Sequence, residues 1–397
     1  STLSAFLAFP TVYIIPGLLS ILLISKELTQ SFKQLIVLSF FLSTIIAVIV
    51  VSILMLFSIT ICTFSIGIIY LFLNFTLITL LTISGKTNQI RASRLDYTFL
   101  GISFIAYISL VCLFIHMPRL FTMDETSYIT WSRYAILKGE TYPLGLQPAK
   151  FDLTYLIKGR FFWTLLITSF IGATGLAAYQ SYVISSTFLP MIALASTLLI
   201  PSKFKGNRIL EIAVFTLVLT NPLLLLFSGF ILNDLAISFY LLLAVLLFIR
   251  SLGKDHPNRI SLDFHSLLLS FLTLVIAFLI KENIVIVLPM YFILVFYILR
   301  YKLYKISKLW RVILCVLTLP LIVYEVLVDI PYVISVWFTK NETLAMLTGK
   351  LLFISPAEWI LGLFIPTPWK PTTIFSHDFH DYLHYLYRML SPEVLSL

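Results

Sequence analysis

Charged residues are scarce in this chain of 397 residues: Asp, Glu, Lys and Arg make up 11%, whereas hydrophobic residues make up 60%. Soluble globular proteins average about 25% charged and about 45–50% apolar residues. The chain therefore has too few polar side chains to cover a surface that faces water. This composition excludes a soluble globular protein and predicts an integral membrane protein.

The sequence also lacks the alternation of apolar and polar residues that is typical of transmembrane β-barrels. Its apolar residues form long runs instead, and a helix needs about 20 such residues to cross a bilayer. We predict an all-α polytopic membrane protein with about eleven transmembrane helices. The expected spans are 5–25, 35–57, 59–83, 98–116, 180–200, 209–228, 235–250, 264–280, 284–300, 312–330 and 351–366.

Cysteine is nearly absent, and its three residues, Cys62, Cys112 and Cys315, all lie in apolar runs. They are interpreted as small core residues and carry no redox information. Residues 1–25 have neither a basic start nor a small-residue cleavage site, so they are interpreted as a span and not as a signal peptide.

The net charge of +9 comes without a basic helix or a basic patch interleaved with aromatic residues, so no nucleic-acid partner is expected. Lys and Arg accumulate in the cytoplasmic loops of membrane proteins. If loop 117–160 lies outside, this rule decides between two interpretations of 160–179. If 160–179 crosses the membrane, the later basic loops fall on the outer side, against this rule. As an interfacial juxtamembrane helix, it leaves most of the 27 basic residues inside, and we expect the latter.

The expected organisation has three parts. Residues 1–116 form four N-terminal transmembrane helices. Residues 117–179 form the first large outer loop, with juxtamembrane helices and an acidic motif. Residues 180–397 contain the remaining spans and a C-terminal amphipathic segment.

Ionisable residues in or beside spans are costly and usually functional. Asp124 opens the polar loop, Asp234 lies where a span begins, and Lys281 lies where a span ends. In the interfacial interpretation all three fall on the outer side. Such convergence is expected of an active site at a membrane face.

Four ordered stretches carry a family resemblance. They are Asp124-Glu125-Thr126-Ser127-Tyr128 with Gly139-Glu140-Thr141-Tyr142-Pro143, Phe162-Trp163 through Phe170-Ile171-Gly172, Phe227-Ser228-Gly229 through Asn233-Asp234-Leu235, and Ile280-Lys281-Glu282-Asn283 through Leu288-Pro289. Together they resemble the GT-C superfamily of polyprenyl-phosphate-dependent glycosyltransferases, in particular the branch of lipid A aminoarabinose transferases and protein O-mannosyltransferases. Unlike that branch, the chain has four expected spans before the acidic loop.

The resemblance implies transfer of a sugar from a polyprenyl- or dolichyl-phosphate carrier to a hydroxyl acceptor (glycan, lipid or protein) at the non-cytoplasmic face, with inversion. It implies Asp124 as the base, Glu125 as a supporting group and Asp234 as a second catalytic carboxylate. The implied substrate-binding residues are Tyr128, Lys158, Arg160, Asn233 and Lys281. Asp124 and Asp234 would be the ligands if a divalent cation is used; no other cofactor is implied.

Each residue also has a plainer interpretation. Asp124 and Asp234 suit helix N-caps, and Lys281 suits a local ion pair with Glu282. Lys158 and Arg160 suit side chains that reach the headgroups. Glu211, near an inner helix end, is interpreted as solvated at the rim. His377, His380, Asp381 and His384 share a helix face, as metal ligands or as the polar side of an amphipathic helix.

Two other classes of function remain open. A transporter or flippase for a lipid-linked or anionic substrate predicts internal repeats and interrupted helices near the midplane. A structural or assembly subunit predicts charges that are capped or paired, with no cavity.

Overall fold

The computed structural model describes residues 2–24, 32–84, 94–115, 123–138, 161–200, 207–231, 233–251, 254–256, 259–260 and 263–281 of a first unit, residues 1–281. Of a second unit, residues 282–397, it describes residues 327, 330–335 and 343–344. The expected spans 284–300 and 351–366, most of 312–330 and the histidine cluster at 377–384 lie outside the described residues.

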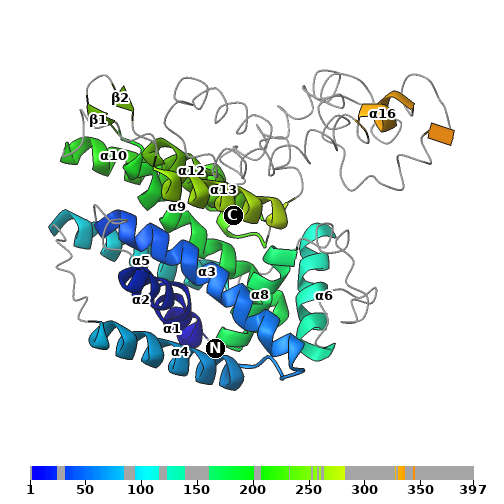
Figure 1. Cartoon of the computed structure of the whole chain (residues 1–397). Coiled ribbons are helices and arrows are strands. Elements are labelled where there is room, and N and C mark those ends of the chain that lie inside the picture. Colours follow the sequence, from blue (N-terminus) through cyan, green and yellow to red (C-terminus); the bar gives the residue numbers. More distant parts are fainter. Residues whose placement is uncertain are drawn as a thin grey trace. The chain divides into compact units, whose positions relative to one another are not determined.

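The described part of the chain is helical apart from one short hairpin (Figure 1). The helices of the first unit are α1 (Thr2–Tyr13), α2 (Ile15–Ile24), α3 (Phe32–Leu56), α4 (Thr63–Ile83), α5 (Arg94–Phe114), α6 (Met123–Lys138), α8 (Phe161–Thr174), η1 (Ala178–Thr187), α9 (Phe188–Leu198), α10 (Arg208–Leu219), α11 (Pro222–Ser228), α12 (Asp234–Ser251) and α13 (Phe264–Ile280). Strands β1 (Lys254–His256) and β2 (Arg259–Ile260) form the hairpin, and α16 (Ile330–Val333) belongs to the second unit.

Within the described residues, six helical segments are long and apolar enough to cross a membrane, and the structure therefore supports an integral membrane protein. They are Leu3–Leu23, Phe32–Leu56, Thr63–Ile83, Arg94–Phe114, Ala178–Leu198 and Asp234–Ser251. Each overlaps an expected span. The expected span 209–228 is a pair, α10 and α11, bent by 52°, and the expected span 264–280 is α13, with only 17 residues.

Helices α2 and α3 cross at close range because Gly17 has no side chain. The Gly17 N–H donates to Ser43 Oγ at 2.8 Å. A Cβ atom at this position would lie 2.7 Å from Ser43 Oγ and 2.8 Å from the carbonyl carbon of Ser39. Small residues permit such close backbone approach between membrane helices. The absence of a side chain at Gly17 thus sets the distance between α2 and α3.

Replacing Gly17 with alanine is expected to cost about 1–3 kcal/mol of stability, because the new methyl group would overlap the α3 backbone. Gly67 in α4 is a matched control, since nothing lies within 4 Å of a Cβ there. Gly67→Ala should be neutral or stabilising by about 0.5–1 kcal/mol through helix propensity. Unfolding in mixed micelles measures both; equal effects would contradict the close crossing.

Two sets of contacts between helices identify the two ends of the bundle. At one end Phe114 and Ile115, which finish α5, lie against Gly229 and Gln180. We call this the site end, because α11 finishes and α12 begins there. At the opposite end the starts of α3 and α10 meet in an ion pair between Lys33 Nζ and Glu211 Oε2 at 2.8 Å. These side chains are only 10% and 12% exposed, so the interpretation of Glu211 as solvated at the rim is wrong.

Helix α8 lies inside the bundle, in contact with α1, α3, α4, α6, α13 and η1. Nearly all of its residues are buried, whereas a helix lying along a membrane surface exposes one face to water. Both of its ends contact segments of the site end: Trp163 donates to the Ile231 carbonyl, and a Cβ at Gly175 would lie 2.9 Å from Thr63 Oγ1. These contacts agree with the expectation that α8 does not run from one end of the bundle to the other. Its residues are, however, more buried than those of a helix that lies along a membrane surface.

The polypeptide turns sharply after α8 at Gly175, whose φ is +65°. This left-handed conformation is favourable for glycine alone among common residues. The Gly175 N–H donates to the Ile171 carbonyl at 2.8 Å and so satisfies one of the free carbonyls at the helix end. The chain then enters η1 and α9.

Helices α12 and α13 form a pair joined by the β1–β2 hairpin, which the sequence did not predict. The strands are antiparallel, and the Asp263 N–H donates to the Ser251 carbonyl at 2.8 Å. In mid-helix, Ser270 Oγ donates to the Ala244 carbonyl at 2.7 Å. Because the two helices run in opposite directions, the first residue of α12 and the residue after α13 meet at the site end.

Candidate functional site

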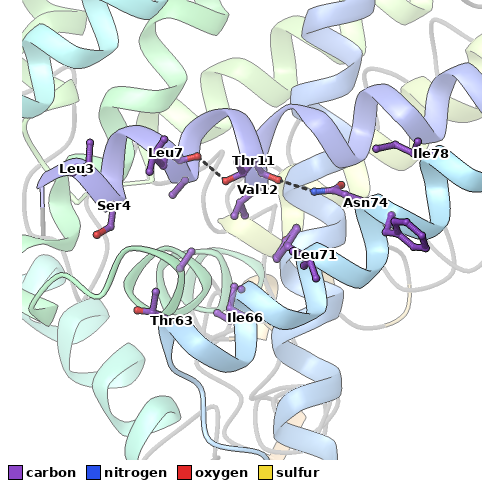
Figure 2. Close-up of a pocket in the computed structure, with 15 residues that line it drawn as sticks. Leu3, Ser4, Leu7, Thr11, Val12, Thr63, Ile66, Leu71, Asn74 and Ile78 are labelled. Atoms are coloured by element: carbon purple, nitrogen blue, oxygen red, sulfur yellow. Dashed lines mark hydrogen bonds between the residues drawn. The ribbon is translucent and has the colours of Figure 1, made fainter.

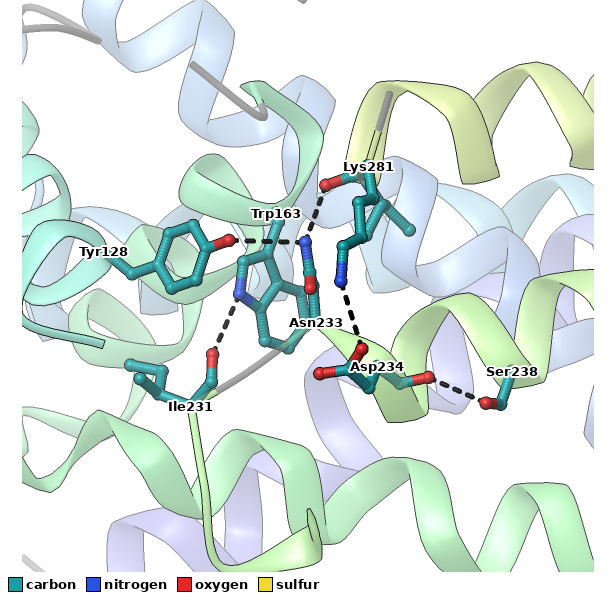
Figure 3. A network of polar contacts seen from close by, with 8 residues as sticks. Tyr128, Trp163, Ile231, Asn233, Asp234, Ser238 and Lys281 are labelled. Carbon is teal, nitrogen blue, oxygen red and sulfur yellow. Dashed lines mark hydrogen bonds and ion pairs between the residues drawn. The ribbon is translucent and has the colours of Figure 1, made fainter. Parts of the chain in front are cut away.

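The candidate site lies where α6, α8, α12 and α13 meet (Figure 3). Tyr128 comes from the second turn of α6, Asn233 and Asp234 from the start of α12, and Lys281 from the end of α13. Trp163 comes from the start of α8. These segments are far apart in the sequence, and only the packing of the helices brings them together.

Asn233 makes the central polar contacts. Its side-chain nitrogen donates to Tyr128 Oη at 3.3 Å and to the Ile280 carbonyl at 2.9 Å. Tyr128 is 0% exposed and Asn233 is 1% exposed. The resemblance implied that both residues contact the substrate. Their burial favours instead a role in holding the site together.

Asp234 and Lys281 form an ion pair, with 3.2 Å between Oδ1 and Nζ. Their side chains are 38% and 27% exposed, so both are reachable from outside the protein. Asp234 also lies in the first turn of α12, where the helix dipole favours a negative charge. A partly solvated pair of this kind contributes at most about 1 kcal/mol to stability. The pair is therefore better suited to binding a charged ligand than to holding the fold.

Two further hydrogen bonds connect the segments that carry the site. Trp163 Nε1 donates to the Ile231 carbonyl at 3.0 Å, and Ser132 Oγ donates to the Thr164 carbonyl at 3.3 Å. The first joins α8 to the segment before α12, and the second joins α6 to α8. The sequence did not identify Trp163 as a member of the site. Two signals pointed to Trp163: its place in one of the stretches that carry the resemblance, and an indole N–H in an otherwise apolar run, which needs a partner when buried.

The remaining predicted residues are placed only in part. Asp124 and Glu125 lie in the first turn of α6, and Asp124 precedes Tyr128 by four residues, on the same face of the helix. Their side chains lie outside the described residues, as do Lys158, Arg160 and Glu282. The partner of Lys281 in the described structure is Asp234, which the sequence had not paired with it.

A divalent cation does not fit the described part of the site. Asp234 is the acidic side chain described there, and it faces the ammonium group of Lys281, which repels a cation. Within the described ranges no three His, Cys, Asp or Glu side chains gather as metal ligands do. The expected ligand role of Asp124 stays a prediction.

A separate groove of about 620 Å³ lies between α1 and α4 (Figure 2). Its walls are mostly apolar, and it contains none of the predicted site residues. Asn74 on α4 reaches across to the Thr11 carbonyl on α1, with 3.5 Å between nitrogen and oxygen. Tyr70 Oη and Asn74 Oδ1 are buried at the groove and have no hydrogen-bond partner among the residues that the structure describes.

Comparisons of the chain with protein-family models, with curated proteins and with solved structures found no match. The class of the protein is given by its own helices: it is an integral membrane protein with a polar cluster at one end of a helical bundle.

Proposed function

We propose that this chain is a multi-pass membrane glycosyltransferase that transfers a sugar from a polyprenyl-phosphate carrier to a hydroxyl acceptor on the non-cytoplasmic side. In this proposal the bundle has a GT-C-like architecture of about eleven spans. The acceptor is a glycan, a lipid or a protein. The surrounding membrane supplies the lipid-linked donor.

One observation supports the proposal most: three of the four stretches that carry the resemblance meet at Asn233, and the fourth lies beside them. The first stretch contributes Tyr128, the third contributes Asn233 and Asp234, and the last contributes Ile280 and Lys281. The remaining stretch contributes Trp163. A chance likeness at four separate places would not be expected to converge on one site.

The chemistry assigns one task to each charged residue. The acceptor oxygen bonds to the anomeric carbon from the face opposite the phosphate, which inverts the configuration. The carbon–oxygen bond to the phosphate breaks, and polyprenyl phosphate leaves with the electron pair. Asp124 takes the hydroxyl proton as general base, and Lys281 stabilises the departing phosphate. Asp234 orients Lys281, with Glu125 in support and Lys158 or Arg160 near the phosphate.

Purified chain in nanodiscs, supplied with a labelled polyprenyl-phosphate sugar and extracted membrane acceptors, tests the proposal. We expect sugar to move from the carrier to an acceptor and free polyprenyl phosphate to appear. If the donor binds but stays intact under all acceptor conditions, glycosyl transfer is wrong.

The proposed sidedness makes a prediction for Cys62, which precedes α4 at the site end. Cys62 is exposed, as is Cys112, so the interpretation of these two residues as core residues is wrong. Backbone and side-chain hydrogen bonds from Ser65 lower the pKa of the Cys62 thiol, so more of it is the reactive thiolate at neutral pH. In a Cys112→Ala/Cys315→Ala background, an impermeant maleimide should label Cys62 from the non-cytoplasmic side. Ser65→Ala should slow this labelling. Labelling from the cytoplasmic side alone would show that the chain has the opposite orientation in the membrane.

The bent pair α10–α11 is the observation that favours a transporter instead, because transporters use interrupted helices at their binding sites. Here, however, the break is capped locally: Asn221 Oδ1 accepts from the N–H groups of Leu223 and Leu224 at 3.0 and 3.1 Å. Asn221 is exposed. Flux of intact lipid-linked sugar across proteoliposomes, without cleavage, would support the transporter.

A further inference from the structure

Asn233 connects three helices that are distant in the sequence. Its amide group bonds to Tyr128 in α6 and to Ile280 at the end of α13 (Figure 3). Its backbone carbonyl accepts from the Ile237 N–H at 2.9 Å, at the start of α12. One side chain and its own backbone thus join the three segments that form the candidate site.

The contact requires an amide. A backbone carbonyl only accepts hydrogen bonds, so the group that faces Ile280 must be a donor. The NH₂ group of asparagine has two hydrogens and can serve Ile280 and Tyr128 together. A leucine has a similar size and shape but no donor, and unlike an aspartate it cannot gain one by taking up a proton. At this depth of burial, a carbonyl left without its partner is unfavourable.

The sequence neighbours of these contacts are the charged residues. Asp234 directly follows Asn233, and Lys281 directly follows Ile280. A bond between Asn233 and Ile280 therefore holds the backbones of both charged residues at a fixed separation. Tyr128 extends the connection to the helix turn that bears Asp124, one turn earlier in α6.

We propose that Asn233 is a positioning residue, which touches no substrate and aligns Asp234 and Lys281 with the first turn of α6. The use of this alignment in catalysis rests on the proposed glycosyl transfer. The alignment itself is a property of the fold and has a test of its own.

The structural test compares Asn233→Leu with wild type by hydrogen–deuterium exchange. Two amides report on the joined segments: Ile237 N–H at the start of α12 and Lys281 N–H, which donates to the Ala277 carbonyl at 3.0 Å. Peptides that contain them should exchange about tenfold faster in the variant, as expected for a lost buried hydrogen bond. Tyr128→Phe, which keeps the Ile280 bond, should have a smaller effect. Ser238→Ala is the control, since in the described part of the chain Ser238 bonds within α12, to the Asp234 carbonyl.

The functional test uses decaprenyl phosphate as the probe, titrated against the full chain in detergent. Asn233→Leu and Lys281→Met should each weaken binding, by about tenfold for the loss of one charge-assisted contact. If Asn233 acts by placing Lys281, the double variant should bind no more weakly than Lys281→Met alone. Effects that multiply would indicate two independent roles.

Each outcome decides a separate question. Unchanged exchange in Asn233→Leu overturns the positioning role, whatever the chain does with lipid phosphates. Faster exchange in this variant, with binding losses that multiply, assigns Asn233 to the fold alone and also overturns the role. Faster exchange in this variant, together with a wild-type chain that binds no decaprenyl phosphate, leaves the alignment standing and counts against the proposed function.

Discussion

Replacing Glu211 with leucine is expected to lower the free energy of unfolding by about 3–5 kcal/mol, the usual cost of removing one member of a buried ion pair. Lys33 would then remain with its ammonium group nearly buried, at the start of α3, over the ring of Phe99 at 5.2 Å. The aromatic ring offsets only part of this cost, about 1–2 kcal/mol for a desolvated cation–π contact. Unfolding in mixed micelles measures the change.

Two further variants make this test specific. The double variant Lys33→Met/Glu211→Leu should recover most of the loss, because two apolar side chains of similar size leave no unpaired charge. Lys281→Met is the matched control, since it breaks the more exposed ion pair with Asp234 and should cost at most about 1 kcal/mol. If Glu211→Leu and Lys281→Met prove equally mild, the Lys33–Glu211 pair does not anchor α3 to α10.

The sequence predicted the positions of the helices better than the contacts between them. Runs of apolar residues predict spans because a bilayer demands them, and the six membrane-length segments all fall within or beside expected runs. The bend between α10 and α11 had a signal in the pair Asn221-Pro222, since proline disfavours the helical conformation in the residue before it. That signal was not used, and 209–228 was predicted as one span.

The position of α8 shows a different limit. Its all-apolar surface was interpreted as an interfacial helix on grounds of loop charge, yet a helix that is apolar on every side is typical of a buried one. The pairing of Lys33 with Glu211, 178 residues away, had no signal at all. Neither did the bond between Asn233 and the Ile280 backbone. Long-range partners of this kind are fixed by packing, which one sequence does not show.

The prediction that separates catalysis from stabilisation of the helix start concerns Asp124, the second residue of α6. Asp124→Asn removes the favourable interaction of its charge with the helix dipole, which is worth about 0.3–1 kcal/mol, so the start of α6 should lose little stability. If Asp124 is the general base, the same change should slow sugar transfer by about 10²–10⁴-fold, because an amide does not accept the hydroxyl proton. Transfer rates and thermal stability, measured on the same preparations, distinguish the two roles.

Glu125→Gln is the matched control, because it removes the neighbouring charge from the same helix turn. Successive residues of a helix point about 100° apart, so Glu125 does not share the face that Asp124 shares with Tyr128. Its loss should reduce the rate much less, in keeping with a supporting role. If Asp124→Asn retains the wild-type rate, or if Glu125→Gln proves the more damaging change, the base is not Asp124. The carboxylate would then be sought at Asp234, which has Lys281 at 3.2 Å and is accessible from outside.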